Sequence, residues 1–159
     1  MKYLFIALLA LTTTSAHAQM SEGTVKQFLQ KHIAAFASCN PQTLKTHMDK
    51  HFAPSFTLTA QSPEGESRTA SKADMMQAFT QIPDDFDFSQ LSAEDCAPKF
   101  TVSGLTVNGP NAQFVTLEQT QFTDENGQNK TASLTCTNNA TLQNNNVIIT
   151  KSNCVASIQ

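Results

Sequence analysis

The sequence predicts an α+β domain, in which helices come first and a long antiparallel sheet follows. Apolar residues from Val25 to Phe36 recur at spacings of three and four, as on one face of a helix. From Phe100 onward, apolar and polar residues alternate in four stretches separated by short turn sequences. Short turns join antiparallel neighbours, so the sheet must curl over the helices to bury their apolar faces.

Two helices are expected at the start of the domain. The first covers residues 21–39 and buries one apolar stripe, made of Val25, Phe28, Leu29, His32, Ile33 and Phe36. The second begins with Asn40 as its N-cap and Pro41 at the first helical position. It runs to about Phe52, and Pro54 then prevents its continuation.

A short strand, a turn and a third helix come next. Residues 56–59 read as the strand, and Ser62 to Gly65 as the turn that sends the chain back through Arg68. Ser71 and Asp74 have the spacing of a capping box, which opens a helix closed by Pro83. The apolar residues of this helix are Met75, Met76, Phe79 and Ile82. The four later strands are expected over residues 100–107, 112–123, 131–142 and 147–157.

The first eighteen residues have the pattern of an export signal. Lys2 gives a positive start, Tyr3 to Leu11 are apolar, and Ala16 to Ala18 form a small-x-small cleavage site. Because a membrane span needs about 20 apolar residues, we expect no membrane anchor. The prediction is a periplasmic or secreted protein, cleaved near Ala18, with residues 19–159 forming a single domain.

The charge of that domain argues against polyanionic partners. Without Lys2, nine basic residues remain beside 13 acidic ones, a net charge of −4, and the basic residues form no cluster. We therefore expect neither nucleic acid nor an anionic membrane as a partner.

Four cysteines in an exported chain predict disulfides, although four buried thiols remain the alternative. Of the three connectivities, strand register favours one. A hairpin closed through residues 144–146 places Cys136 opposite Cys154, together with the pairs Leu134 with Ala156 and Leu142 with Ile148. Cys39 and Cys96 are then left to each other. No C-x-x-C spacing supports a metal site.

The order of these elements resembles the nuclear transport factor two-like superfamily, which includes SnoaL-like cyclases and ketosteroid isomerases. The resemblance spans residues 24–157 and includes the Asn40-Pro41 helix start and the Phe52-Ala53-Pro54 helix end. It implies a cone of sheet around the helices with a pocket at the open end. It also implies a homodimer through the open sheet, where Thr116, Glu118 and Thr120 would alternate with Val115 and Leu117.

The resemblance also gives a test for isomerase chemistry. In ketosteroid isomerases an acidic base follows the second helix, at a position that falls near Ala60, and a Tyr stabilises the oxyanion. No Asp or Glu lies between Asp49 and Glu64, and the one Tyr, Tyr3, is in the signal. Isomerase chemistry is therefore not expected. His32 on the apolar helix face is the one acid or base candidate, and simple packing is its alternative role.

Two further groups of residues are weaker candidates. His47 and His51 are one helical turn apart and could bind a metal, but Met48 replaces the Glu of the H-E-x-x-H pattern. We expect them to be ordinary surface or half-buried residues, and we expect no cofactor. The segment Asp84, Asp85, Phe86, Asp87 and Phe88 could form a partner-binding lip, or its two Phe rings could fold back on the core.

The sequence thus predicts an exported, non-catalytic domain that binds a small apolar ligand or a protein partner. The alternative is a SnoaL-like enzyme of the cyclase or isomerase type that uses an acid or base in its pocket. Fold alone cannot choose between them, because one architecture hosts both roles.

Overall fold

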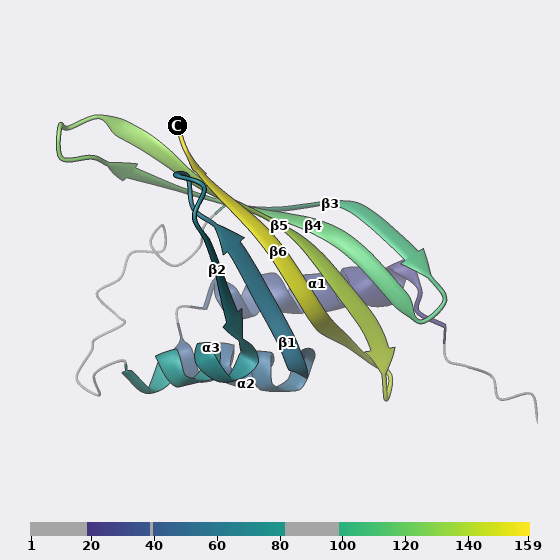
Figure 1. Cartoon of the computed structure of the whole chain (residues 1–159). Coiled ribbons are helices and arrows are strands. Elements are labelled where there is room, and N and C mark those ends of the chain that lie inside the picture. The colour runs from purple at the N-terminus through teal and green to yellow at the C-terminus, as the bar shows by residue number, and fades with distance from the viewer. Residues whose placement is uncertain (1–18, 39, 82–98) are drawn as a thin grey trace, which may run out of the picture.

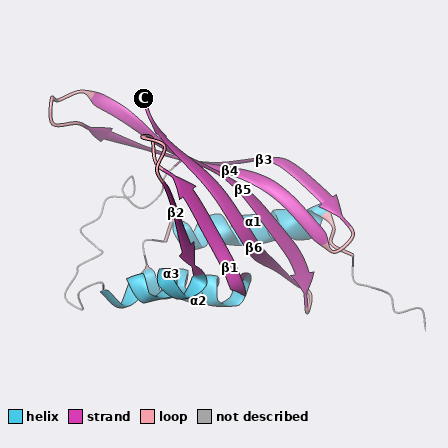
Figure 2. Cartoon of the chain, in the orientation of Figure 1, coloured by secondary structure: helices cyan, strands magenta, loops and turns pink. Residues whose placement is uncertain are grey.

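The structure is a computed structural model that describes residues 19–38, 40–81 and 99–159. Within these residues the strands form one six-stranded sheet in the order β2-β1-β6-β5-β4-β3. The helices lie together on one face of this strongly curved sheet (Figures 1 and 2). The expected α+β class is confirmed.

The helices begin where the sequence predicts. Helix α1 is Glu22–Phe36, α2 is Pro41–His51 and α3 is Lys72–Ala78, which a short 3-10 turn extends over Phe79–Gln81. The Asn40 side chain accepts a hydrogen bond from the Thr43 amide at 3.0 Å, which satisfies one free donor at the start of α2. Ser71 and Asp74 form the predicted capping box of α3.

The strands after α2 are longer than expected. Strand β1 is Phe52–Gln61 and pairs with β2, Ser67–Ser71. Pro54 lies inside β1, where the pairing with β6 is interrupted between Phe52 and Thr57. A proline is tolerated there because its missing N–H is not needed by the ladder.

The last four strands form the predicted meander. They are β3 (Lys99–Asn108), β4 (Asn111–Thr123), β5 (Asn129–Gln143) and β6 (Asn146–Ile158), and each pairs antiparallel with the next. In two of the turns a glycine adopts a left-handed backbone, Gly109 at φ 58° and Gly127 at φ 76°.

The expectation of a wholly antiparallel sheet is wrong, because β1 pairs with β6 in parallel. A four-stranded meander would leave the outer side of β6 as an open row of unpaired backbone groups. Strand β1 satisfies these groups, and β2 then covers β1. The sheet is therefore mixed, and the neighbour of the last strand is β1, which precedes the whole meander in the sequence.

The face of the sheet toward the helices is built from four rows of side chains that lie side by side across the strands. The first row is the most exposed and the fourth is the most buried. In order they are Phe100, Glu118, Leu134 and Ala156; Val102, Thr116, Cys136 and Cys154; Phe114, Asn138, Ser152 and Leu58; and Ala112, Ala140, Ile149 and Phe52.

The β5–β6 hairpin follows the predicted register only in part. Cys136 faces Cys154 and Leu134 faces Ala156, as expected, but Leu142 faces Val147 rather than Ile148. The turn has two residues rather than three, because Asn144 and Asn145 both adopt left-handed conformations. A bulge at Thr150 shifts the register by one residue, because Asn139 pairs with Lys151 whereas Ala140 pairs with Ile149.

The bulge decides which residues of β6 face inward. Val147 and Ile149 are buried before it, and Ser152 and Cys154 are buried after it. In an unbroken strand these two pairs would lie on opposite faces, since side chains alternate. Ile148 therefore does not share a face with Cys154, as strict alternation along the strand would require.

The Cys136–Cys154 disulfide is present and joins β5 to β6 in the second row. Both cysteines are buried, at 6% and 3% exposure. The predicted partners Cys39 and Cys96 lie outside the described residues. In the described ranges, no helix is long and apolar enough to cross a membrane.

Replacing both cysteines, Cys136→Ala with Cys154→Ala, should lower the free energy of unfolding by about 3 kcal/mol, because the cross-link closes a loop of this length. Equilibrium denaturation in urea measures the change. Val155→Ala, at an exposed neighbouring position, is the control and should cost under about 0.5 kcal/mol. A double variant as stable as the wild type would contradict a structural role for this bond.

Candidate ligand-binding pocket

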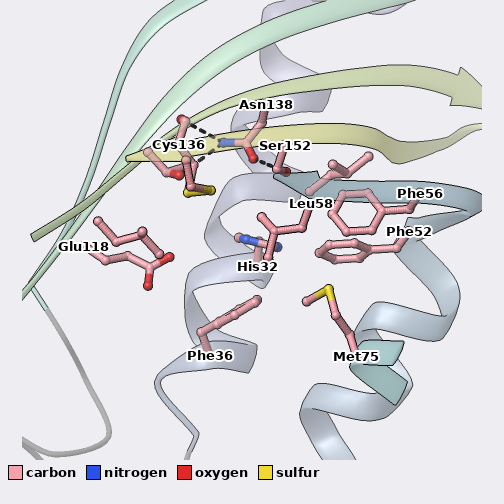
Figure 3. A pocket seen from close by; sticks show the side chains of 14 residues that line it. His32, Phe36, Phe52, Phe56, Leu58, Met75, Glu118, Cys136, Asn138 and Ser152 are labelled. Atoms are coloured by element: carbon pink, nitrogen blue, oxygen red, sulfur yellow. Dashed lines mark hydrogen bonds between the residues drawn. A yellow bond between two sulfur atoms is a disulfide. The ribbon is translucent and has the colours of Figure 1, made fainter. Parts of the chain in front are cut away.

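A pocket of about 160 Å³ lies between the helices and the inner face of the sheet (Figure 3). Its apolar wall comes from α1, α3, β1 and the sheet rows, and consists of Phe36, Phe52, Phe56, Leu58, Met75, Leu134 and Ile149, with the Cys136–Cys154 disulfide beside them. Its polar residues are His32, Thr116, Glu118, Asn138 and Ser152. The pocket at the cone's mouth, implied by the resemblance, is therefore found, and it is mainly apolar.

Three of the polar residues satisfy one another. The Ser152 hydroxyl donates to Asn138 Oδ1 at 2.6 Å, and Asn138 Nδ2 donates to Thr116 Oγ1 at 3.1 Å (Figure 3). The same amide nitrogen also donates to the Cys136 carbonyl oxygen at 3.2 Å. These hydrogen bonds offset the cost of burying the polar groups. The three side chains in the middle of the pocket therefore keep their positions without a ligand.

His32 is held at the pocket wall by a second histidine. Its Nδ1 lies 2.9 Å from Nε2 of His47 on α2. Aromatic rings surround His32, with centroid distances of 4.6 Å to Phe36, 5.5 Å to Phe28 and 6.1 Å to Phe100. Because His32 is only 6% exposed, its ring orientation is fixed by this packing.

His51 completes a stack of three histidines that joins the helices to the sheet. Its ring centroid is 4.8 Å from that of His47, and its Nδ1 donates to the Val147 carbonyl oxygen at 3.0 Å. Burial, together with the smaller effect of neighbouring basic groups, lowers the pKa of His32 to about 3 and that of His47 to about 4. Burial also lowers the pKa of His51. All three rings are therefore neutral at pH 7.

The neutral pair allows two proton arrangements. If His32 Nδ1 carries the proton, it donates to His47, and His32 Nε2 is an acceptor. If His47 Nε2 carries it, His32 Nε2 becomes a donor instead. Nε2 is the only ring nitrogen of His32 left for a ligand, since Nδ1 is already bonded to His47.

The weak metal candidates lie elsewhere than expected. His47 and His51 are both buried, at 9% exposure each, and they have no hydrogen-bond partner in common. His47 faces His32, whereas His51 faces a backbone carbonyl. Among the residues that the structure describes, no group of three or more His, Cys, Asp or Glu could hold a metal ion.

Glu118 is the pocket residue that the sequence analysis placed wrongly. We expected it in a sheet surface for a homodimer, but it lines the pocket in the first row, between Phe100 and Leu134. Burial raises the pKa of its carboxyl group. Strict alternation from the buried Ala112, Phe114 and Thr116 would have identified it, because Glu118 is the next residue on that face.

The remaining predicted sites are not placed together by the structure. The expected lip of Asp84, Asp85, Phe86, Asp87 and Phe88 lies outside the described residues. Thr116 and Glu118, which we expected in the open sheet of a homodimer, both line the pocket on the inner face. His32, the predicted acid or base candidate, does line the pocket.

No protein-family model matches the chain, and no curated protein matches it. Solved structures do match. An NTF-2 like protein of unknown function from Shewanella oneidensis has a TM-score of 0.56 at 15% identity, covering 86% of this chain and 99% of that one. The CaMKII hub of S. rosetta has a TM-score of 0.54 at 15% identity, covering 88% and 100%.

This chain has the nuclear transport factor two-like fold. A candidate dehydratase of the NTF2-like family from Streptomyces avermitilis also matches, with a TM-score of 0.53, 10% identity and coverage of 85% and 94%. At such low identity these matches show the shared fold. The nuclear transport factor two-like fold predicted from the order of the elements is therefore confirmed, and the role of its pocket rests on the residues that line it.

The histidine stack predicts a loss of stability in mild acid. In the folded chain the pKa values of His32 and His47 are about 3 and about 4, whereas the unfolded chain has the ordinary value of 6.5. The contribution of these histidines to the free energy of unfolding is therefore fully present above pH 6.5. It falls as the pH drops toward their lower folded-state pKa values, by roughly 1 kcal/mol per histidine at pH 5.5.

Urea denaturation at pH 7.5 and pH 5.5 measures this effect, and NMR of the imidazole nitrogens reports the charge directly. His47→Gln should reduce the difference between the two pH values. Imidazoles that titrate near pH 6.5 in the folded protein would contradict the buried, neutral stack.

Proposed function

We propose that this protein is an exported, non-catalytic domain that binds a small, mainly apolar molecule in the pocket between its helices and sheet. The observation that carries the proposal is the pocket itself, which is predominantly apolar and has a few polar groups at defined positions. Ligand sites in proteins commonly have this composition.

The size of the pocket limits the ligand. A cavity of about 150 Å³ in another protein accommodates benzene. The volume here is about 160 Å³, so the ligand that fits inside is about one substituted ring or a short branched chain. Larger molecules such as steroids need several hundred cubic ångströms and would extend beyond the pocket.

The chemistry of the wall favours binding over catalysis. Asn138, Ser152 and Thr116 are engaged with one another, and His32 has one nitrogen engaged with His47. The chain has no Tyr after Tyr3 to act as an oxyanion donor. A catalytic role would therefore depend on Glu118 and the remaining nitrogen of His32.

One observation keeps the enzyme as a second candidate. Glu118 and His32 share one pocket, and burial shifts their pKa values in directions that favour the neutral forms of both. Such perturbed pairs are frequent in acid–base enzymes. Mass spectrometry of a bound ligand, before and after incubation with the protein, separates the two roles, because only an enzyme would change its mass or its isomeric form.

Export and assembly are supported by separate features. The signal-like residues 1–18 and the Cys136–Cys154 bond both suit an oxidising compartment. A homodimer would use the outer face of the sheet, where Val155 is 53% exposed. A protein partner at the mouth of the cone is the remaining alternative to a small ligand.

Filling the pocket should abolish binding of a small apolar probe. Leu134→Phe adds bulk to the pocket wall, and we expect toluene to bind at least about tenfold more weakly, because the cavity volume is lost. Val155→Phe introduces the same side chain on the exposed face and should leave binding unchanged.

Isothermal titration calorimetry with toluene provides the measurement. Equal affinity of the wild type and the Leu134→Phe variant would place the binding site elsewhere. No detectable binding of any small apolar probe to the wild type would favour the protein partner instead.

A further inference from the structure

The pocket is electrostatically one-sided. Among the described residues that line it, Glu118 and His32 are the ionisable side chains, and none is Lys or Arg. Because His32 is neutral, Glu118 is the one described lining residue that can carry a full charge. The described lining therefore provides a carboxylate without a matching cation.

Glu118 is also held in an apolar setting. In the sheet it lies directly between Phe100 and Leu134, whose side chains share its face. Figure 3 shows its carboxyl group on the side of the pocket toward His32 and Phe36. In the described part of the chain it makes no ion pair, and burial is the cause of its raised pKa. A partly buried carboxylate in such a place is stabilised by a cation that brings its own positive charge.

We propose that the ligand is a small apolar amine, whose protonated nitrogen pairs with Glu118 while its apolar body fills the inner pocket. This inference rests on the proposed function, since it names the ligand class of the same site. Anionic ligands of the same size, such as small carboxylates, would be repelled by Glu118.

The geometry of the rows suits this arrangement. Successive rows are two residues apart along a strand, a separation of roughly 7 Å. An ammonium group beside Glu118 in the first row therefore places a single ring over the second row. There the disulfide supplies an apolar contact, and Phe36 and Met75 line the same pocket.

Neighbouring groups assist an ammonium group rather than compete with it. Phe100 lies opposite Glu118 in the sheet, so an aromatic side chain is close to the charge. His32 Nε2 can accept a hydrogen bond from the amine when its Nδ1 proton is donated to His47. The amine would select this one of the two proton arrangements of the histidine pair.

Three probes of similar size test the inference by isothermal titration calorimetry at pH 7.5: benzylamine, which is protonated, benzyl alcohol, which is neutral, and benzoate, which is anionic. We expect benzylamine to bind at least about tenfold more tightly than benzyl alcohol, because a charge-assisted hydrogen bond replaces a neutral one. Benzoate should bind most weakly.

Two variants locate the effect. Glu118→Gln keeps the shape of the side chain and should remove the preference for benzylamine while leaving benzyl alcohol within about twofold. Glu22→Gln removes the same charge from the exposed start of α1 and should preserve the preference. The comparison of probes on the wild type needs no variant, so it stands even if Glu118→Gln folds poorly.

The outcomes separate this inference from the proposed function. If benzyl alcohol binds as tightly as benzylamine, or if Glu118→Gln keeps the preference, the amine inference is wrong while the pocket remains a binding site. If neither toluene nor any of the three probes binds, the proposed function fails and the inference with it.

Discussion

The register between β5 and β6 is the constraint on which the pocket depends. The Cys136–Cys154 bond fixes this register covalently, at the second row of the inner face. A slip of β6 by one residue would turn Ser152 and Cys154 to the outer face, away from Asn138 and Cys136 on β5. The pocket would then lose its polar network and part of its wall together. The disulfide thus acts on function through register, in addition to its effect on stability.

The bulge near Thr150 complements the bond. It lets the β6 residues on both sides of it face the helices, so that Ile149 and Ser152 line the same pocket. The apolar inner end and the polar middle of the pocket therefore each receive a residue from β6. The histidine stack then ties this strand to the helices, because His51 bonds to Val147 and His47 bonds to His32. Sheet register and helix placement are coupled through these contacts.

Much of the fold could be predicted from local patterns in the sequence. Helix starts at Asn40 and Ser71 follow from side chains that cap the backbone within three residues. The Cys136–Cys154 pair follows from alternation within one hairpin. The parallel pairing of β1 with β6 could not be predicted in this way, since it joins segments about ninety residues apart and has no local signal.

The site was less predictable because its chemistry arises from tertiary contacts. His32 could be placed on a buried helix face, but its bond to His47 depends on how α1 and α2 pack. Alternation along the strand after Phe114 places Glu118 on the same face as Phe114. Whether that face is buried depends on which side of the sheet the helices cover. The bulge near Thr150 has no sequence pattern strong enough to reveal it, and neither has the two-residue turn that pairs Leu142 with Val147 instead of Ile148.

The central claim is that this pocket is a ligand site in which Glu118 receives a positive charge. A crystal structure of the protein grown with benzylamine tests it most directly. The account predicts density for the ring over the disulfide and the nitrogen within hydrogen-bond distance of the Glu118 carboxyl group. An empty pocket in crystals that contain benzylamine at another place on the surface would contradict it.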